Sequence, residues 1–173
     1  MADIFSKAER SRVMGSIRSR GNKNTELRLA KILRRAGVRG WRRHSSVPGR
    51  PDFVIRQLRL AIFVDGCFWH GCRRHGRKPE DNREYWLPKL ARTIARDKAT
   101  TSRLRRDGWT VLRLWEHELY AEEHVLQRCS IAMKRATAKK KFGAGITPPV
   151  SKPSATKYRR ARSKGPPKVV KLP

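Results

Sequence analysis

Residues 48–75 read PGRPDFVIRQLRLAIFVDGCFWHGCRRH, and this stretch decides the fold. It contains two apolar runs, 52–55 and 58–64, which are rich in Val, Ile and Phe and are separated by a tight link. That pattern predicts a hairpin of two central strands covered on both faces. Asp52 opens the first run and Asp65 follows the second, so pairing of the strands brings both carboxylates to the same end of the hairpin.

The segments around the hairpin predict a mixed α/β domain. In chain order we expect a short basic helix carrying Met14, a helix over 25–36, an extended segment over 41–47, a helical turn at 82–87, a main helix over 88–106, a strand over 109–115 and a helix over 118–135. The break at residue 88 is expected because proline removes a backbone donor. A strand, a long helix and another strand imply a crossover, and therefore a mixed central sheet flanked by helices.

Charge is the dominant feature of the composition. The chain of 173 residues has a formal net charge of +29 and a pI near 11.6. Such a surface attracts polyanions, most often nucleic acid and less often an acidic membrane face. A basic ribosome-bound or chromatin-like protein would fit the charge equally well. The longest aliphatic or aromatic run, 60–64, is too short to span a bilayer. Three cysteines, an odd number, favour a reducing compartment, so the cytoplasm is the expected location.

The composition changes near the C-terminus. The last 40 residues contain 13 Lys or Arg, six prolines and no acidic residue. A segment of this kind cannot bury enough apolar surface to fold. We therefore expect a folded domain over 1–135 and a basic, proline-rich, disordered tail over 136–173, which would add salt-sensitive phosphate contacts.

The acids of the hairpin suit phosphodiester hydrolysis. That reaction needs a hard cation such as Mg²⁺, and carboxylates and backbone carbonyls bind such cations. Asp52 and Asp65 would supply the carboxylates, and His70 could act as general acid or base on the same phosphate. Pro-Asp and Asp-Gly are also common turn sequences, so each acid alone is a weak signal.

Four further side chains form a candidate zinc site, namely Cys72, His75, Asp97 and His117. Cys-x-x-His is a plausible metal-binding pair. Asp97 lies on the apolar stripe of the main helix, where an acid is costly unless it is paired or coordinated. The alternatives are a free cysteine with two surface histidines, and an ion pair between Asp97 and an arginine such as Arg96.

Bulky side chains in the same basic loop suggest contact with DNA. Phe68 and Trp69 are adjacent and flanked by glycines and arginines, and insertion between base pairs is one use for such residues. Trp86 could join them, and Met14 could be a small apolar wedge. Packing against neighbouring helices is the alternative for each of them.

These residues resemble the very short patch repair (Vsr) mismatch endonucleases. The resemblance covers about residues 2–120 and rests on Pro-Gly-Arg-Pro-Asp-Phe, Phe-Val-Asp-Gly-Cys-Phe-Trp-His, Tyr-Trp, Arg-Asp and Gly-Trp-x-Val-Leu-x-x-Trp-Glu. It implies a restriction-endonuclease-like PD-(D/E)XK core. It also implies a Mg²⁺-dependent enzyme that nicks DNA 5′ of the thymine in a T·G mismatch left by deamination of 5-methylcytosine.

The resemblance assigns roles to the residues that match its motifs. Asp52 resembles the metal-binding aspartate and His70 the catalytic histidine, in place of the lysine usual in the wider superfamily. Val64 would offer its main-chain carbonyl to Mg²⁺, and Glu26 matches an acid near the metal. Asp65 stands where some members have histidine.

The same comparison covers the aromatic and zinc residues. Phe68, Trp69 and Trp86 match the side chains that intercalate beside the mismatch, and Met14 matches a wedge from the opposite groove. The residues that fall on the structural zinc site are Cys72, His75, Asp97 and His117, the last in place of the usual cysteine.

The sequence thus predicts a Mg²⁺-dependent, zinc-containing T·G mismatch endonuclease. Its expected partners are double-stranded DNA and, potentially, mismatch-repair proteins, with no membrane. We expect it to act as a monomer at the bacterial nucleoid. The alternatives are a nuclease of the same fold with another DNA target, and a non-catalytic zinc-containing nucleic-acid-binding protein.

Overall fold

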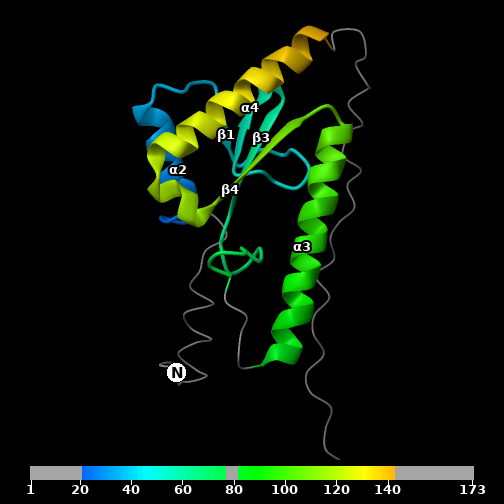
Figure 1. Cartoon of the computed structure of the whole chain (residues 1–173). Helices are drawn as coiled ribbons and strands as arrows, with labels where there is room; N and C mark the ends of the chain where they lie inside the picture. The colour runs from blue at the N-terminus through cyan, green and yellow to red at the C-terminus, as the bar shows by residue number, and fades with distance from the viewer. Residues whose placement is uncertain (1–20, 77–81, 143–173) are drawn as a thin grey trace, which may run out of the picture.

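A computed structural model describes residues 21–76 and 82–142 of the chain. These residues form one four-stranded sheet of order β1-β2-β3-β4 (Figure 1). The strands are β1 (Arg42–Arg43), β2 (Phe53–Ile55), β3 (Leu60–Asp65) and β4 (Thr110–Trp115). Strand β2 is antiparallel to both β1 and β3, and β4 is parallel to β3. The predicted mixed α/β architecture is therefore confirmed.

The expected hairpin is present as β2 and β3. Phe53 pairs with Ile62 and Ile55 with Leu60, and a short 3-10 turn, η1 (Arg56–Leu58), joins the strands. Leu58 belongs to this turn rather than to the second strand. Arg59 completes the turn with a left-handed backbone, φ 48°. Every residue of β2 and β3 is buried, as the continuous apolar runs predicted.

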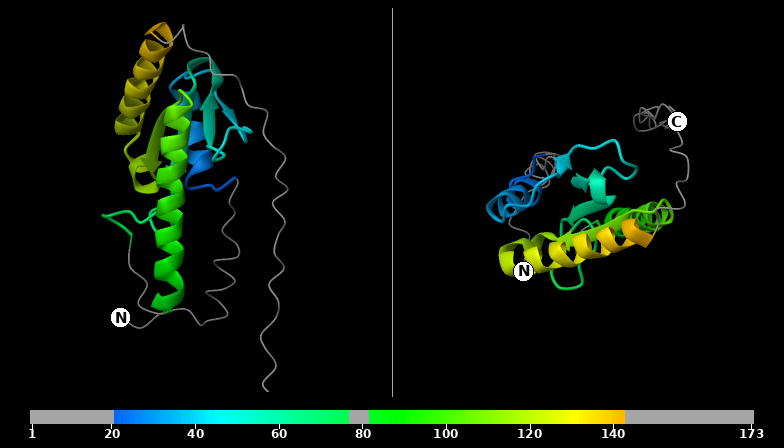
Figure 2. Two further views of the ribbon diagram at one scale, coloured as in Figure 1. Left: turned by 90° about the vertical axis from the view of Figure 1, so that its right-hand side faces the viewer. Right: turned by 90° about the horizontal axis from the view of Figure 1, so that it is seen from above.

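Helix α3 (Arg83–Arg106) makes the crossover to β4. It is a single helix that includes Pro88, so the expected break at that residue is not observed. A proline at this position removes only one backbone donor, and the hydrogen bonds of the following turns carry the helix onward. The helix extends well beyond the sheet, beside the loop that follows β3 (Figure 2).

The two faces of the sheet have separate apolar clusters. One cluster joins α2 (Glu26–Arg35) and α4 (Glu122–Phe142) to the sheet through side chains that include Leu29, Phe53, Ile62 and Val125. The other joins Leu104 of α3 to Val54, Ala61 and Phe63. Because alternate residues of a strand point to opposite faces, α2 and α4 cover one face of the sheet and α3 the other.

Helix α4 passes the boundary expected near residue 135. It continues to Phe142, and Ala136 is buried in the core. A short 3-10 segment, η2 (Glu116–Tyr120), precedes it. The predicted N-terminal helix with Met14 and the rest of the predicted tail lie outside the described residues. Within 21–76 and 82–142, no helix is long and apolar enough to cross a membrane.

Candidate active site and metal centre

Asp52 stands immediately before β2, at the end of the sheet where β3 finishes. Its Oδ2 accepts a hydrogen bond from the backbone N–H of Val64 at 2.7 Å, which holds the carboxylate beside the main chain of β3. The pKa of Asp52 is raised to about 6: burial is the largest cause, the Val64 hydrogen bond opposes it, and the nearby carboxylates of Glu26 and Asp65 add to the rise. Several negative charges therefore meet at this end of the sheet.

Glu26 opens α2 and faces the same hollow as Asp52. Its Oε2 accepts the Gly21 N–H at 2.6 Å, while the buried Oε1 has no hydrogen-bond partner within the part of the chain that the structure describes. Arg43 Nη1 lies 3.1 Å from Oε1, but without hydrogen-bond geometry. The hollow is lined by Glu26, His44, Ser45, Ser46, Arg50, Pro51 and Asp52.

This arrangement fits a hard divalent cation. The carboxylate of Glu26 raises the pKa of Asp52, a repulsion that a nearby cation would offset, and the buried Oε1 of Glu26 has no hydrogen bond among the described residues. Asp52, the main chain at Val64 and Glu26 are the residues that would hold it, directly or through water. The residues predicted for Mg²⁺ are thus brought together, with the exception of Asp65.

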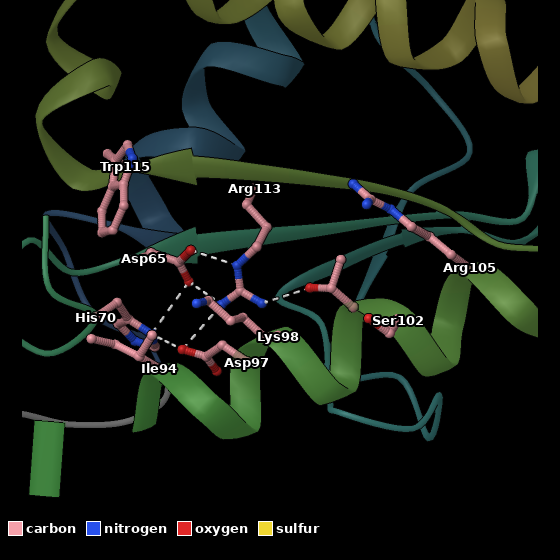
Figure 3. A pocket seen from close by; sticks show the side chains of 10 residues that line it. Asp65, His70, Ile94, Asp97, Lys98, Ser102, Arg105, Arg113 and Trp115 are labelled. Carbon is pink, nitrogen blue, oxygen red and sulfur yellow. Dashed lines mark hydrogen bonds and ion pairs between the residues drawn. The ribbon is translucent and has the colours of Figure 1, made fainter. Parts of the chain in front are cut away.

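His70 and Asp97 form a hydrogen-bonded pair. His70 comes from the loop after β3 and Asp97 from the middle of α3, and His70 Nδ1 lies 2.6 Å from Asp97 Oδ2 (Figure 3). An ionised carboxylate can only accept a hydrogen bond, so in this pair a neutral imidazole would carry its proton on Nδ1 and keep Nε2 as an acceptor. Gly71, with φ +69°, permits this approach, because a Cβ there would stand 2.7 Å from Ile94 Cδ1 of α3.

Asp65 is engaged by Arg113, a residue that the sequence interpretation did not identify. Both carboxylate oxygens accept hydrogen bonds from the guanidinium, Oδ2 from Nε and Oδ1 from Nη2, each at 2.6 Å. Burial disfavours the charge on Arg113, but the pairing with Asp65 outweighs it and raises the arginine pKa. A basic residue inside the apolar strand sequence Thr-Val-Leu-Arg-Leu-Trp was the available signal.

A second cluster consists of Cys67, Cys72, His75 and His117. The four donor atoms all lie within 4.8 Å of one another. His117 Nδ1 is 3.2 Å from Cys67 Sγ and 3.7 Å from Cys72 Sγ. In tetrahedral zinc sites with bonds of about 2.0–2.3 Å, donor atoms are separated by roughly 3.3–3.8 Å. The cluster therefore has the composition and spacing of a structural Cys2His2 zinc site.

Burial has opposite consequences for metal binding at the two kinds of side chain in this cluster, because it disfavours the thiolate and favours the neutral imidazole. Burial raises the pKa of the Cys67 thiol, and a coordinated Zn²⁺ would offset this by binding the thiolate. Burial and the neighbouring His75 lower the pKa of His117, which favours the neutral imidazole that binds metals.

The structure changes one member of the predicted zinc set. Asp97 was grouped with Cys72, His75 and His117, but the structure places it on His70 and brings Cys67 into the cluster. The sequence argument correctly required a partner for an acid on an apolar stripe and chose the wrong one. The spacing Cys-x4-Cys-x2-His from residue 67 to residue 75 was the signal for Cys67.

The three aromatics predicted to contact DNA form one cluster. Phe68, Trp69 and Trp86 pack edge to face, with ring centroids 5.1–5.8 Å apart. Tyr85, 58% exposed, packs on Trp86, and Lys89 Nζ lies within 5.6 Å of the ring centroids of Trp69, Tyr85 and Trp86. Met14 lies outside the described residues.

Comparisons with known proteins identify the family of the chain. The profile of the family "DNA mismatch endonuclease Vsr" matches residues 2–75. The DNA mismatch endonuclease Vsr of Escherichia coli strain K12 is 41% identical over 124 residues, which cover 71% of this chain and 79% of that protein.

Two enzymes with a different description are similarly related. The type II nicking enzyme V.NmeDIP of Neisseria meningitidis serogroup C is 41% identical over 119 residues, 68% of this chain and 80% of the relative. The type II nicking enzyme V.NaeI of Lentzea aerocolonigenes is 43% identical over 116 residues, 64% of this chain and 69% of the relative. With these identities over most of each relative, the chain belongs to the Vsr DNA mismatch endonuclease family.

Proposed function

We propose that this protein is a divalent-metal-dependent endonuclease that nicks one strand of double-stranded DNA, 5′ of the thymine of a T·G mismatch. The observation that carries the proposal is the meeting of two groups at one end of the sheet. Asp52 and Glu26 form a carboxylate hollow on one side, and His70 held by Asp97 forms a proton acceptor on the other. Together they supply the two requirements of phosphodiester hydrolysis, charge stabilisation and proton transfer.

The chain's own residues would divide the reaction between them. Asp97 keeps the proton of His70 on Nδ1, so that Nε2 accepts the proton of the attacking water. Asp52 and Glu26 would hold the divalent cation, which when bound would supply Lewis-acid polarisation of the phosphate oxygens. Zinc held by Cys67, Cys72, His75 and His117 would anchor the loop that carries His70 to the end of β4.

The aromatic cluster supports a distorted duplex as the substrate. Phe68, Trp69 and Trp86 form one apolar group in the basic part of the molecule next to His70, suited to entering a base stack that a mismatch has weakened. We also propose that the enzyme acts as a monomer. Bacterial chromosomal DNA, at the nucleoid, is the proposed target, with mismatch-repair proteins as potential partners.

One assay separates this proposal from its alternatives. Zinc-loaded protein is incubated with duplexes that differ only in one base pair, T·G or matched, with each strand labelled separately, in Mg²⁺ and in Mg²⁺-free buffer. The expected result is a Mg²⁺-dependent nick on the T strand only, lost in Asp52→Asn and His70→Gln. Nicking of the matched duplex at the same rate would indicate another DNA target. Duplex binding without any cleavage would indicate a non-catalytic binding protein and contradict the proposal.

A further inference from the structure

Arg113 lies at the centre of the charge network around His70. It projects from the middle of β4, where its strand partner on β3 is Phe63. Its guanidinium carbon stands 4.8 Å from the centroid of the Phe63 ring, and Nη1 lies 3.4 Å from Thr101 Oγ1 of α3. These contacts fix the plane of the guanidinium from both sides, between the sheet and α3.

The fixed guanidinium joins two acids that approach the same histidine nitrogen. Arg113 Nη2 donates to Asp65 Oδ1 at 2.6 Å and lies 3.5 Å from Asp97 Oδ2. His70 Nδ1 lies 2.6 Å from that Asp97 oxygen and 3.6 Å from Asp65 Oδ1. Two carboxylates are therefore candidates for the single Nδ1 proton of His70. Arg113 occupies both oxygens of Asp65 and leaves Asp97 as the acceptor.

We infer that Arg113 is a positioning residue for the nicking reaction: by binding Asp65 in a bidentate ion pair, it reserves the Nδ1 proton of His70 for Asp97 and keeps Nε2 aimed at the phosphodiester. Asp65 then acts as the anchor of Arg113, and neither binds the metal nor transfers a proton. The inference rests on the proposed function, because it concerns the geometry of the same histidine.

Removing either partner should damage the site, and removing both should repair much of it. Without Arg113, the 5% exposed Asp65 is an uncompensated acid that competes for His70 Nδ1 and repels Asp97. Without the charge of Asp65, Arg113 has only Asp97 as a close acidic partner and competes with His70 for it. An uncharged pair removes both competitions. This reciprocal behaviour distinguishes positioning from direct contact with DNA.

The kinetic test uses Arg113→Met, Asp65→Asn and the double variant Asp65→Asn/Arg113→Met in the full zinc-loaded chain. With the duplex that the wild type nicks best, each single variant should lose at least about tenfold in kcat, with KM within about twofold. The double variant should return to within about threefold of the wild-type kcat. Arg105→Met is the matched control, because it removes an exposed arginine that lines the pocket beside His70 and Asp97 and makes no ion pair with either acid, and it should leave kcat unchanged.

Three kinetic results would overturn the inference. They are an unchanged kcat in Arg113→Met, a rise in KM without loss of kcat, and a double variant as slow as Arg113→Met. If Arg113→Met does not fold, Asp65→Asn and the double variant still give the comparison, because suppression of the Asp65→Asn defect is expected.

A second readout needs no activity. Long-range proton–nitrogen NMR correlations of the imidazoles, assigned with His70→Gln, should show His70 only as the Nδ1–H tautomer in the wild type and as a mixture in Arg113→Met. The same tautomer in both proteins would overturn the inference. If the wild type nicks no duplex, the proposed function fails, while this measurement still decides the role of Arg113.

Discussion

His70 Nδ1 and Asp97 Oδ2 lie 2.6 Å apart, across the gap between the loop after β3 and the middle of α3. His70 would take part in proton transfer. Its partner Asp97 is not a member of the cluster formed by Cys67, Cys72, His75 and His117. We therefore propose that Asp97 acts with His70 in catalysis and does not bind zinc, and the two roles predict different behaviour for one variant.

Asp97→Asn should therefore abolish most nicking while leaving zinc in place. The amide cannot stabilise the Nδ1–H tautomer or a positively charged imidazolium as a carboxylate does, and a loss of about 10²- to 10⁴-fold in kcat is expected. Metal analysis should still find one zinc per chain. Loss of zinc with retained nicking would restore Asp97 to the zinc site.

Substitutions in the cluster of Cys67, Cys72, His75 and His117 should have the opposite effect on zinc content. Cys67→Ser and His117→Ala should each lose zinc and lower the thermal midpoint, because a structural metal contributes folding free energy directly. His117→Cys is the matched control and should retain zinc, since a thiolate at that position completes a Cys3His set. Equal zinc content in Cys67→Ser and the wild type would show that Cys67 is not a ligand.

Asp52 should show a cost in stability that depends on pH. Its pKa is about 6 in the folded chain against 3.8 ordinarily, so between these values the unfolded chain gives up the proton that the folded chain keeps. The free energy of unfolding therefore falls as pH rises through this window, and the cost is complete above it. Asp52→Asn, whose amide oxygen can still accept from Val64, should raise the thermal midpoint relative to the wild type at about pH 8 but not at about pH 4.5.

Mg²⁺ gives this experiment its internal check. At the higher pH, Mg²⁺ should stabilise the zinc-loaded wild type and not Asp52→Asn, because binding to the folded state alone raises stability. Asp107→Asn, at an exposed acid on the surface, serves as the control and should behave like the wild type. An equal difference in midpoint at both pH values would contradict the raised pKa.

Trp69→Ala should weaken discrimination more than overall binding. The ring packs against Phe68 and Trp86, and its loss leaves the remaining aromatics less able to fill a gap between bases. Binding of T·G and matched duplexes is compared by titration at fixed salt. Tyr120→Ala, which removes a 62% exposed aromatic elsewhere, should leave the ratio unchanged. Equal weakening for both duplexes in Trp69→Ala would count against the wedge.

The sequence predicted the strands and the crossover because the patterns that indicate them are local. Apolar runs identified β2 and β3, and their pairing necessarily brought Asp52 to the end of β3. The partner of Asp97 could not be predicted in this way, because the contact is tertiary. It depended on which side of α3 meets the loop after β3, and nothing in the spacing of residues 70, 72, 75 and 97 specifies that rotation.

The same limit explains why Cys67 and Arg113 escaped notice. Cys67 lies between Gly66 and the aromatic pair Phe68 and Trp69, a stretch that predicts contact with DNA rather than metal binding. Arg113 binds an acid two strand positions away on the neighbouring strand, a contact that exists only once β3 and β4 pair in parallel. Both are consequences of tertiary register, which a linear pattern does not contain.

The turn after β3 carries the residues proposed for two separate steps, base-stack insertion by Phe68 and Trp69 and proton transfer by His70. The His70 N–H donates to the Gly66 carbonyl at 3.2 Å, and Phe68 and Trp69 are enclosed between those two residues. If a well-stacked duplex prevents the rings of Phe68 and Trp69 from inserting, the displaced loop would move His70 as well. We therefore expect discrimination to appear in the rate of cleavage: a duplex without the mismatch would be bound but not cleaved.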